Sequence, residues 1–174
     1  MIETKLIWIT GLSASGKTSL ANEVVKNLRS RNIHAILLDG DKLREIFDIE
    51  TVNQINHSRE ARISLAMSYS RLCLNLILQG FTVVIATISL FREIHNWNRL
   101  NIPGYFEVYL KIPIQELYKR DPKGIYARFS RSEIKNVAGL DLEIDEPENP
   151  DCIFEFNPER STSDIAAELD KLLR

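Results

Sequence analysis

The strongest constraint on the fold of this chain is a glycine-rich octapeptide near its start. Residues 11–18 read Gly-Leu-Ser-Ala-Ser-Gly-Lys-Thr, and they come just after the apolar run Leu6–Ile9. Apolar residues at helical spacing follow them, namely Leu20, Val24, Val25 and Leu28. A strand, a glycine-rich turn and a helix in this order are typical of a phosphate-binding loop, whose backbone N–H groups converge on the phosphates of a nucleotide.

The loop also predicts which of its residues hold the nucleotide. Lys17 is expected to reach the terminal phosphates and to assist catalysis, and the Thr18 hydroxyl is expected to ligate Mg²⁺. We assign the phosphate cradle to Gly11, Ser13, Ala14, Ser15, Gly16, Lys17 and Thr18.

Short apolar runs alternate with helical patterns along the rest of the chain. The expected strands are Leu6–Thr10, Ala35–Asp39, Thr82–Ser89, Phe106–Ile112 and Cys152–Phe156. The expected helices are Lys17–Ser30, Asp41–Phe47, Ser58–Gln79, Ile114–Arg120 and Thr162–Leu173. Such alternation implies right-handed βαβ units and a parallel sheet that is covered on both faces. We predict an α/β fold, the three-layer sandwich of P-loop NTPases, as a single domain over residues 1–174 with a five-stranded parallel sheet in the order 2-3-1-4-5.

Composition and the lack of certain motifs exclude several classes of function. The formal net charge of −2 gives no reason to expect a nucleic-acid or membrane partner. No signal peptide or membrane-spanning run is apparent, so a cytoplasmic location is expected. The chain lacks the Asn-Lys-x-Asp signature of GTPases and the Leu-Ser-Gly-Gly-Gln stretch of transport ATPases, which leaves a small-molecule kinase.

Two carboxylates follow the second expected strand, in the run Leu37-Leu38-Asp39-Gly40-Asp41. Alternation along a strand would place both on the same side. One can hold Mg²⁺ through water while the other takes a proton from an acceptor hydroxyl, and kinase chemistry needs both roles. Arg44 could clamp an anionic group of the acceptor. Ser89 follows the third strand, and the carboxyl ends of parallel strands share one crevice.

Regular periodicity fades between residues 121 and 151, where charge and Pro or Gly residues accumulate. We expect this 121–151 segment to be a lid that closes over the nucleotide. Arg120 and Lys123 lie at its start, and such cations could stack on a base and neutralise a transferring phosphoryl group. The acidic residues from Asp141 to Asp151 are expected to form a solvated face.

Taken together, the motifs resemble those of the adenylylsulfate kinase family. The matching stretches are the loop at 11–18, Leu38–Arg44, Glu107–Tyr109, Arg120–Tyr126, Glu133–Lys135, Gly139–Asp141 and Pro147–Pro150. The resemblance implies ATP with Mg²⁺ as the donor, and Asp41 as the residue that accepts the proton of the acceptor's 3′-hydroxyl. By the same resemblance Asp39 is its metal-side partner, Arg44 an acceptor ligand, Arg120 and the residues after it a cover for adenine, and Lys135 a lysine near the acceptor.

The departures from the family pattern all fall on the acceptor side. The family's Asp-Arg-x-x-Asn-Ile-Arg-Arg corresponds here to residues 61–68, which keep Arg62 as an acceptor ligand but carry Leu65 and Met67. Leu90 replaces a proline after Ser89, and Val137 replaces the lid aromatic that sandwiches the acceptor's adenine. Candidates for compensating contacts are His57, Arg59, Arg92 and Trp97.

The sequence therefore predicts an ATP-dependent kinase that phosphorylates the 3′-hydroxyl of adenylylsulfate or of a closely related nucleotide. The alternative is a kinase of the same fold with another acceptor, such as a CDP-linked amidate or a small hydroxylated metabolite. A non-catalytic nucleotide-sensing module is disfavoured by the joint presence of Lys17, Thr18, Asp39 and Asp41. The oligomeric state stays open, and a homodimer is one state that we consider.

Overall fold

The computed structural model describes residues 5–47 and 58–173. Its centre is a five-stranded sheet in the order β2-β3-β1-β4-β5, and every strand pairing is parallel. The strands are β1 Leu6–Thr10, β2 Ala35–Asp39, β3 Thr82–Ala86, β4 Tyr105–Lys111 and β5 Cys152–Glu155. The predicted fold class and strand order are confirmed. The expected third strand was too long, because the chain leaves the sheet after Ala86.

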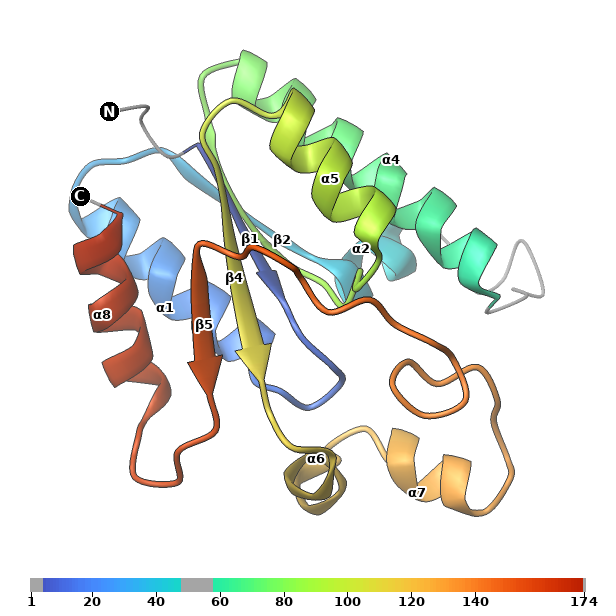
Figure 1. The fold of residues 1–174 in the computed structure, drawn as a ribbon. Helices are drawn as coiled ribbons and strands as arrows, with labels where there is room; N and C mark the ends of the chain where they lie inside the picture. Colours follow the sequence, from blue (N-terminus) through green and yellow to red (C-terminus); the bar gives the residue numbers. More distant parts are fainter. Residues whose placement is uncertain (1–4, 48–57, 174) are drawn as a thin grey trace.

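Helices cover both faces of this sheet (Figure 1). They are α1 Lys17–Ser30, α2 Gly40–Ile46, α4 Arg59–Leu78, α5 Arg92–Asn101, α6 Ile114–Arg120, α7 Ile125–Ser130 and α8 Thr162–Leu172. Helices α1 and α8 lie on one face, and α4 and α5 lie on the other (Figure 1). The sequence reading did not predict α5 or α7.

Alternation along β1 builds a separate hydrophobic core on each face. Ile7 and Ile9 pack in the cluster that includes side chains of α1 and α8, whereas Leu6 and Trp8 pack in the cluster beneath α4 and α5. All five residues of β1 are buried, as expected for a central strand of a doubly covered parallel sheet. Burying one such large apolar side chain contributes about 1.5–3 kcal/mol, so the sheet is a rigid base for the loops that follow it.

One motif of the family resemblance, Glu107–Tyr109, has a structural explanation at Glu107. Its side chain is 2% exposed and lies under α5, where it contacts the His95 ring and accepts a hydrogen bond from the Tyr105 hydroxyl at 2.8 Å. Arg99 approaches its second oxygen at 3.6 Å. The Glu107 backbone N–H donates to Asp151 Oδ2 at 2.8 Å. Glu107 therefore joins α5 and the residue before β5 to β4.

The loops that leave the carboxyl ends of the strands gather at one edge of the sheet (Figure 1). They include the glycine-rich loop after β1, the turn from β2 into α2, and the residues after β3 and β4. Ligands of open α/β sheets bind at this edge. The site predicted from sequence therefore falls where the fold favours binding.

Candidate active site

The glycine-rich loop contains residues with positive φ angles, a conformation that glycine adopts far more readily than other residues. Gly11, Ala14 and Gly16 have φ angles of 151°, 63° and 95°. A Cβ added to Gly11 would lie 2.7 Å from the Leu110 carbonyl oxygen, so a side chain does not fit there. Gly16 is the residue before α1, and the first N–H groups of that helix have no intrahelical acceptor. The loop thus aims unpaired backbone donors at the space above α1, as phosphate binding requires.

Lys17 is folded back into the loop in this structure. Its Nζ donates to the Leu12 carbonyl at 2.6 Å and to Ser15 Oγ at 3.4 Å. Burial lowers the pKa of Lys17 to about 7, and repulsion from Lys123 and Arg44 adds to this while Asp39 opposes it. Lys17, Lys123 and Arg44 therefore repel one another in the absence of a bound anion. A bound phosphate would offset this repulsion and favour the charged form of Lys17.

Thr18 and Asp39 connect the loop to the neighbouring strand. The Thr18 hydroxyl donates to Asp39 Oδ2 at 2.6 Å. Asp39 Oδ1 accepts the backbone N–H groups of Asp41 at 2.9 Å and of Lys42 at 3.3 Å, so Asp39 caps the amino end of α2. The pair predicted to hold a metal ion is therefore in direct contact, and a hydroxyl with a carboxylate is the hard-oxygen donor set that suits Mg²⁺.

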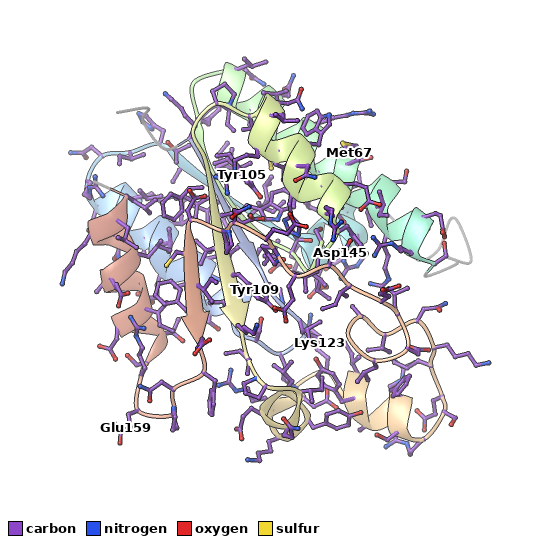
Figure 2. All side chains as sticks on the ribbon, viewed as in Figure 1. Met67, Tyr105, Tyr109, Lys123, Asp145 and Glu159 are labelled. Carbon is purple, nitrogen blue, oxygen red and sulfur yellow. The ribbon has the colours of Figure 1, made fainter. Side chains whose placement is uncertain are left out.

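Asp41 lies in the first turn of α2 rather than on a strand. The expectation that strand alternation aligns Asp39 with Asp41 was wrong, because the strand ends at Asp39 and the cap starts a helix. The Asp41 carboxylate is paired with the guanidinium of Arg44 and with the ammonium of Lys123. Lys123 belongs to the turn between α6 and α7 (Figure 2), so this contact ties the 121–151 segment to α2.

The other predicted ligands are dispersed around this centre. Arg62 donates to the Asn136 carbonyl at 2.9 Å. Ser89 is buried, and its hydroxyl shares a hydrogen bond of 2.8 Å with Thr87 Oγ1. Lys135 is exposed. The Arg120 guanidinium lies 5.3 Å from the centre of the Phe156 ring, just after β5.

The 121–151 segment also touches the glycine-rich loop directly, a contact that the sequence reading did not foresee. The Tyr126 hydroxyl donates to the Ser13 carbonyl at 2.9 Å. A Cβ added to Gly139 would lie 2.8 Å from Leu12 Cδ1, so the chain packs closely on the loop there. The only sequence signal was the presence of Tyr126 and Gly139 in the family motifs.

Most of the acidic residues between Asp141 and Asp151 are exposed, as expected of a solvated face, but several of them form ion pairs. Asp145 pairs with Arg59 at 2.6 Å, and Asp151 pairs with Arg99 at 2.7 Å. These contacts join residues that are far apart in sequence, and a run of acids does not reveal them.

The four candidates for compensating acceptor contacts have different surroundings. Arg59 is held by Asp145, and Arg92 pairs with Glu148 at 3.1 Å. Trp97 is partly buried against the core beneath α4 and α5. His57 lies outside the described residues.

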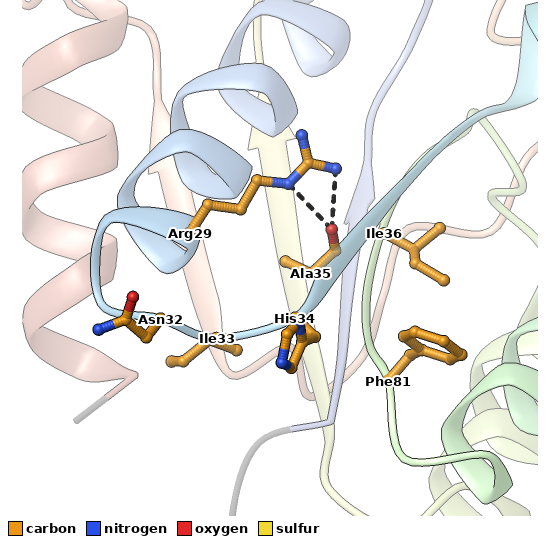
Figure 3. Close-up of a pocket in the computed structure, with 7 residues that line it drawn as sticks. All are labelled: Arg29, Asn32, Ile33, His34, Ala35, Ile36 and Phe81. Carbon is orange, nitrogen blue, oxygen red and sulfur yellow. Dashed lines mark hydrogen bonds between the residues drawn. The ribbon is translucent and has the colours of Figure 1, made fainter.

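A separate cavity of about 560 Å³ lies at the opposite edge of the sheet (Figure 3). Arg29, His34, Ile36 and Phe81 are among its lining residues, and Arg29 donates two hydrogen bonds to the Ala35 carbonyl at 3.1 and 2.9 Å. Ala35 begins β2 and Phe81 precedes β3, so the cavity opens at the amino ends of these strands. It is distinct from the crevice beside the glycine-rich loop.

The fold, the phosphate-binding loop and the Thr18–Asp39 contact define the class of the protein as a P-loop phosphotransferase. The family model for adenylylsulphate kinase matches residues 3–155. This chain therefore belongs to the adenylylsulfate kinase family, whose members are ATP-dependent kinases that phosphorylate a hydroxyl of a nucleotide. Within the described residues, no helix is both long and apolar enough to cross a membrane.

Individual relatives agree with this membership. A cytidine diphosphoramidate kinase of Campylobacter jejuni is 38% identical over 143 residues, covering 82% of this chain and 81% of that protein. A probable adenylyl-sulfate kinase of Archaeoglobus fulgidus is 36% identical over 150 residues, covering 86% and 94%. The structure of the Mycobacterium tuberculosis APS kinase CysC in complex with AMPPNP and APS superimposes with a TM-score of 0.88 at 33% identity, over 99% of each chain.

Proposed function

We propose that this protein transfers the γ-phosphate of ATP to the 3′-hydroxyl of adenylylsulfate or of a closely related nucleotide. The observation that carries the proposal is the 2.6 Å contact between Thr18 and Asp39, because it joins the phosphate-binding loop to the acidic turn that contains Asp41. Donor phosphates and acceptor hydroxyl would then meet in one crevice.

The proposed chemistry uses residues that already surround this crevice. The acceptor oxygen attacks the γ-phosphorus, its proton passes to the Asp41 carboxylate, and the bond from the γ-phosphorus to the bridging oxygen breaks to release ADP. The loop N–H groups hold the phosphates, and Lys17, Arg44 and Lys123 neutralise charge that develops during transfer. Such positioning and charge stabilisation account for most of the catalysis in phosphoryl transfer.

Mg²⁺ belongs to the same proposal. The Thr18 hydroxyl and the Asp39 carboxylate would hold it, the carboxylate through water, which leaves further positions for phosphate oxygens. Bound there, the ion supplies charge neutralisation at the terminal phosphates of ATP.

A second acceptor, cytidine diphosphoramidate, is favoured by a specific feature of the acceptor side. Leu65 and Met67 pack against the hydrophobic core beneath α4, so they offer no polar contact to an acceptor. Val137 is buried and provides no ring on which adenine could stack. The relative from Campylobacter jejuni, which is 38% identical, is a kinase of this kind of substrate.

An acceptor panel tests both candidates. The purified protein is incubated with ATP and Mg²⁺, and ADP release is measured with adenylylsulfate, with cytidine diphosphoramidate and without acceptor. Turnover of adenylylsulfate supports the first proposal, and turnover of cytidine diphosphoramidate alone supports the second. ATP binding without acceptor-dependent ADP release from either compound would contradict both candidates. Only the same negative result with a set of small hydroxylated metabolites would then favour a sensing module.

We further propose that the protein forms a homodimer. Leu78 and Leu100 are 74% and 84% exposed at the carboxyl ends of the neighbouring helices α4 and α5, where a second copy would cover them. Light scattering on the wild type and on a Leu78→Glu, Leu100→Glu variant tests this, because the variant should be a monomer. A cytoplasmic location stays a prediction from the sequence.

A further inference from the structure

A second set of charged contacts links the 121–151 segment to the start of α4. Arg59 Nη2 donates to Asp145 Oδ2 at 2.6 Å, and Arg59 Nη1 donates to the Glu143 carbonyl at 3.2 Å. The Arg59 guanidinium also lies 5.0 Å from the centre of the Phe91 ring. Arg59 and Asp145 are 86 residues apart in the sequence, so their pairing joins two otherwise separate parts of the chain.

Asp145, which is labelled in Figure 2, is held by contacts with more than one element. Its Oδ2 also accepts the backbone N–H of Arg92 at 2.9 Å, at the amino end of α5, and its own N–H donates to the Leu90 carbonyl at 2.9 Å. The N–H of Arg92, and then Arg59, hold the pKa of Asp145 below its usual range despite partial burial. Its carboxylate is therefore charged at neutral pH, where it can pair with Arg59.

Arg62, about one helical turn further along α4, also contacts the 121–151 segment. Residues three apart lie on the same face of a helix, so Arg59 and Arg62 both face the 121–151 segment. Arg62 donates to the Asn136 carbonyl at 2.9 Å. The two arginines thus hold residues 136–145 near both ends.

Residues 136–145 form a turn with its own internal support. The Asp141 carboxylate accepts the backbone N–H groups of Asn136 at 2.8 Å and of Val137 at 2.6 Å. Gly139 of the same turn packs against Leu12 of the phosphate-binding loop. This turn therefore spans from α4 to the phosphate-binding loop, and it forms a wall beside Arg62.

We infer that Arg59 and Asp145 are a positioning pair that sets the acceptor pocket. They fix the first turn of α4, and with it Arg62, against the turn at residues 136–145. The inference rests on the proposed function, which places the acceptor hydroxyl beside Asp41, and on the prediction from the family resemblance that Arg62 is an acceptor ligand. Neither member of the pair contacts the reacting atoms, so each acts through Arg62 and the adjoining wall.

The test is the Asp145→Asn variant, because its side-chain oxygen can still accept the Arg92 N–H while the negative charge closest to Arg59 is lost. Glu93, whose carboxylate lies 3.4 Å from Arg59, is unchanged in this variant. We expect the acceptor KM to rise about tenfold, with kcat and the KM for ATP changing less than about twofold. Glu148→Gln is the matched control: it removes a neighbouring acid whose pair with Arg92 is mostly exposed, and it should change none of these values. Asp145→Asn combined with Arg59→Gln should be no worse than either single variant.

Two results would overturn the inference. One is an unchanged acceptor KM in Asp145→Asn, and the other is a parallel rise of both KM values with a lower thermal midpoint, which would indicate general structural support. Amide hydrogen exchange distinguishes failure of this inference from failure of the proposed function. Even if no acceptor is turned over, exchange in Asp145→Asn should be faster in the first turn of α4 and in residues 136–145 but not in α1. Unchanged exchange in those regions would refute the pair on its own.

Discussion

The lowered pKa of Lys17 predicts that ATP binding depends on pH in a range where most lysines are fully charged. The pKa of Lys17 is lowered to about 7, first by burial and then by Lys123. ATP favours the charged ammonium, so binding must add a proton to the neutral fraction. That fraction is about a tenth at pH 6 and about nine-tenths at pH 8, from the ordinary titration relation.

The expected magnitude follows from these fractions. If only the charged form of Lys17 binds the terminal phosphates well, the Kd for ATP weakens about tenfold between pH 6 and pH 8. The assay is titration of a non-hydrolysable ATP analogue with saturating Mg²⁺, without acceptor, at half-unit steps of pH. Replacing Lys123 removes a repelling charge, so Lys123→Met should shift the weakening to higher pH.

Controls separate Lys17 from other titrating groups. Lys17→Met should bind the analogue weakly and with a nearly flat pH profile. Lys26→Met removes an exposed lysine of the same helix, paired with Glu23, and should reproduce the wild-type profile. A wild-type Kd that changes less than about twofold between pH 6 and pH 8 would refute the reasoning, since a tenfold change is required.

Two further predictions concern stability and the contact with the phosphate-binding loop. Glu107→Gln should lower the free energy of unfolding, measured by urea titration, by about 3 kcal/mol, because it disrupts a buried network of ion pairs and hydrogen bonds. Glu159→Gln, at an exposed position, is the control and should have little effect. Equal losses in the two variants would contradict the buried role of Glu107. Gly139→Ala should raise the KM for ATP several-fold, because an alanine is strained at a φ of +79° and its methyl group would displace the Leu12 side chain of the phosphate-binding loop. An unchanged KM would show that the contact does not support the loop.

The elements that the sequence predicted well have strong local signals. The β-branched and apolar runs of β1 and β3 and the amphipathic α1 were predicted because their patterns match the burial that the sheet imposes. Helix α5 is strongly amphipathic, but Asn96, Asn98 and Asn101 are modest helix formers, so its residue types favour a helix less than those of α1 do. It forms because tertiary contacts favour it, including buried Ile94 and the Asp145 carboxylate at its amino end.

The residues of the candidate site likewise fall into those that local sequence patterns predict and those whose positions depend on the tertiary structure. The loop residues and Asp39 could be predicted because a strand, a glycine-rich turn and an acidic strand end are local patterns. The position of Asp41 could not, because it depends on Asp39 capping a helix instead of continuing the strand. The pairing of Asp145 with Arg59 has no local signal, since an acid in a charge-rich stretch has many possible partners until the fold selects one.

The central claim is that Asp41 accepts the proton of a nucleotide hydroxyl during phosphoryl transfer. The most direct test is acceptor-dependent ADP release by the wild type and by Asp41→Asn, with the acceptor that the panel identifies, alongside the affinity of each for ATP. For Asp41→Asn we expect a kcat lower by about 10²–10⁴-fold than that of the wild type, with nearly unchanged affinity for ATP. Equal turnover by Asp41→Asn and the wild type would contradict it.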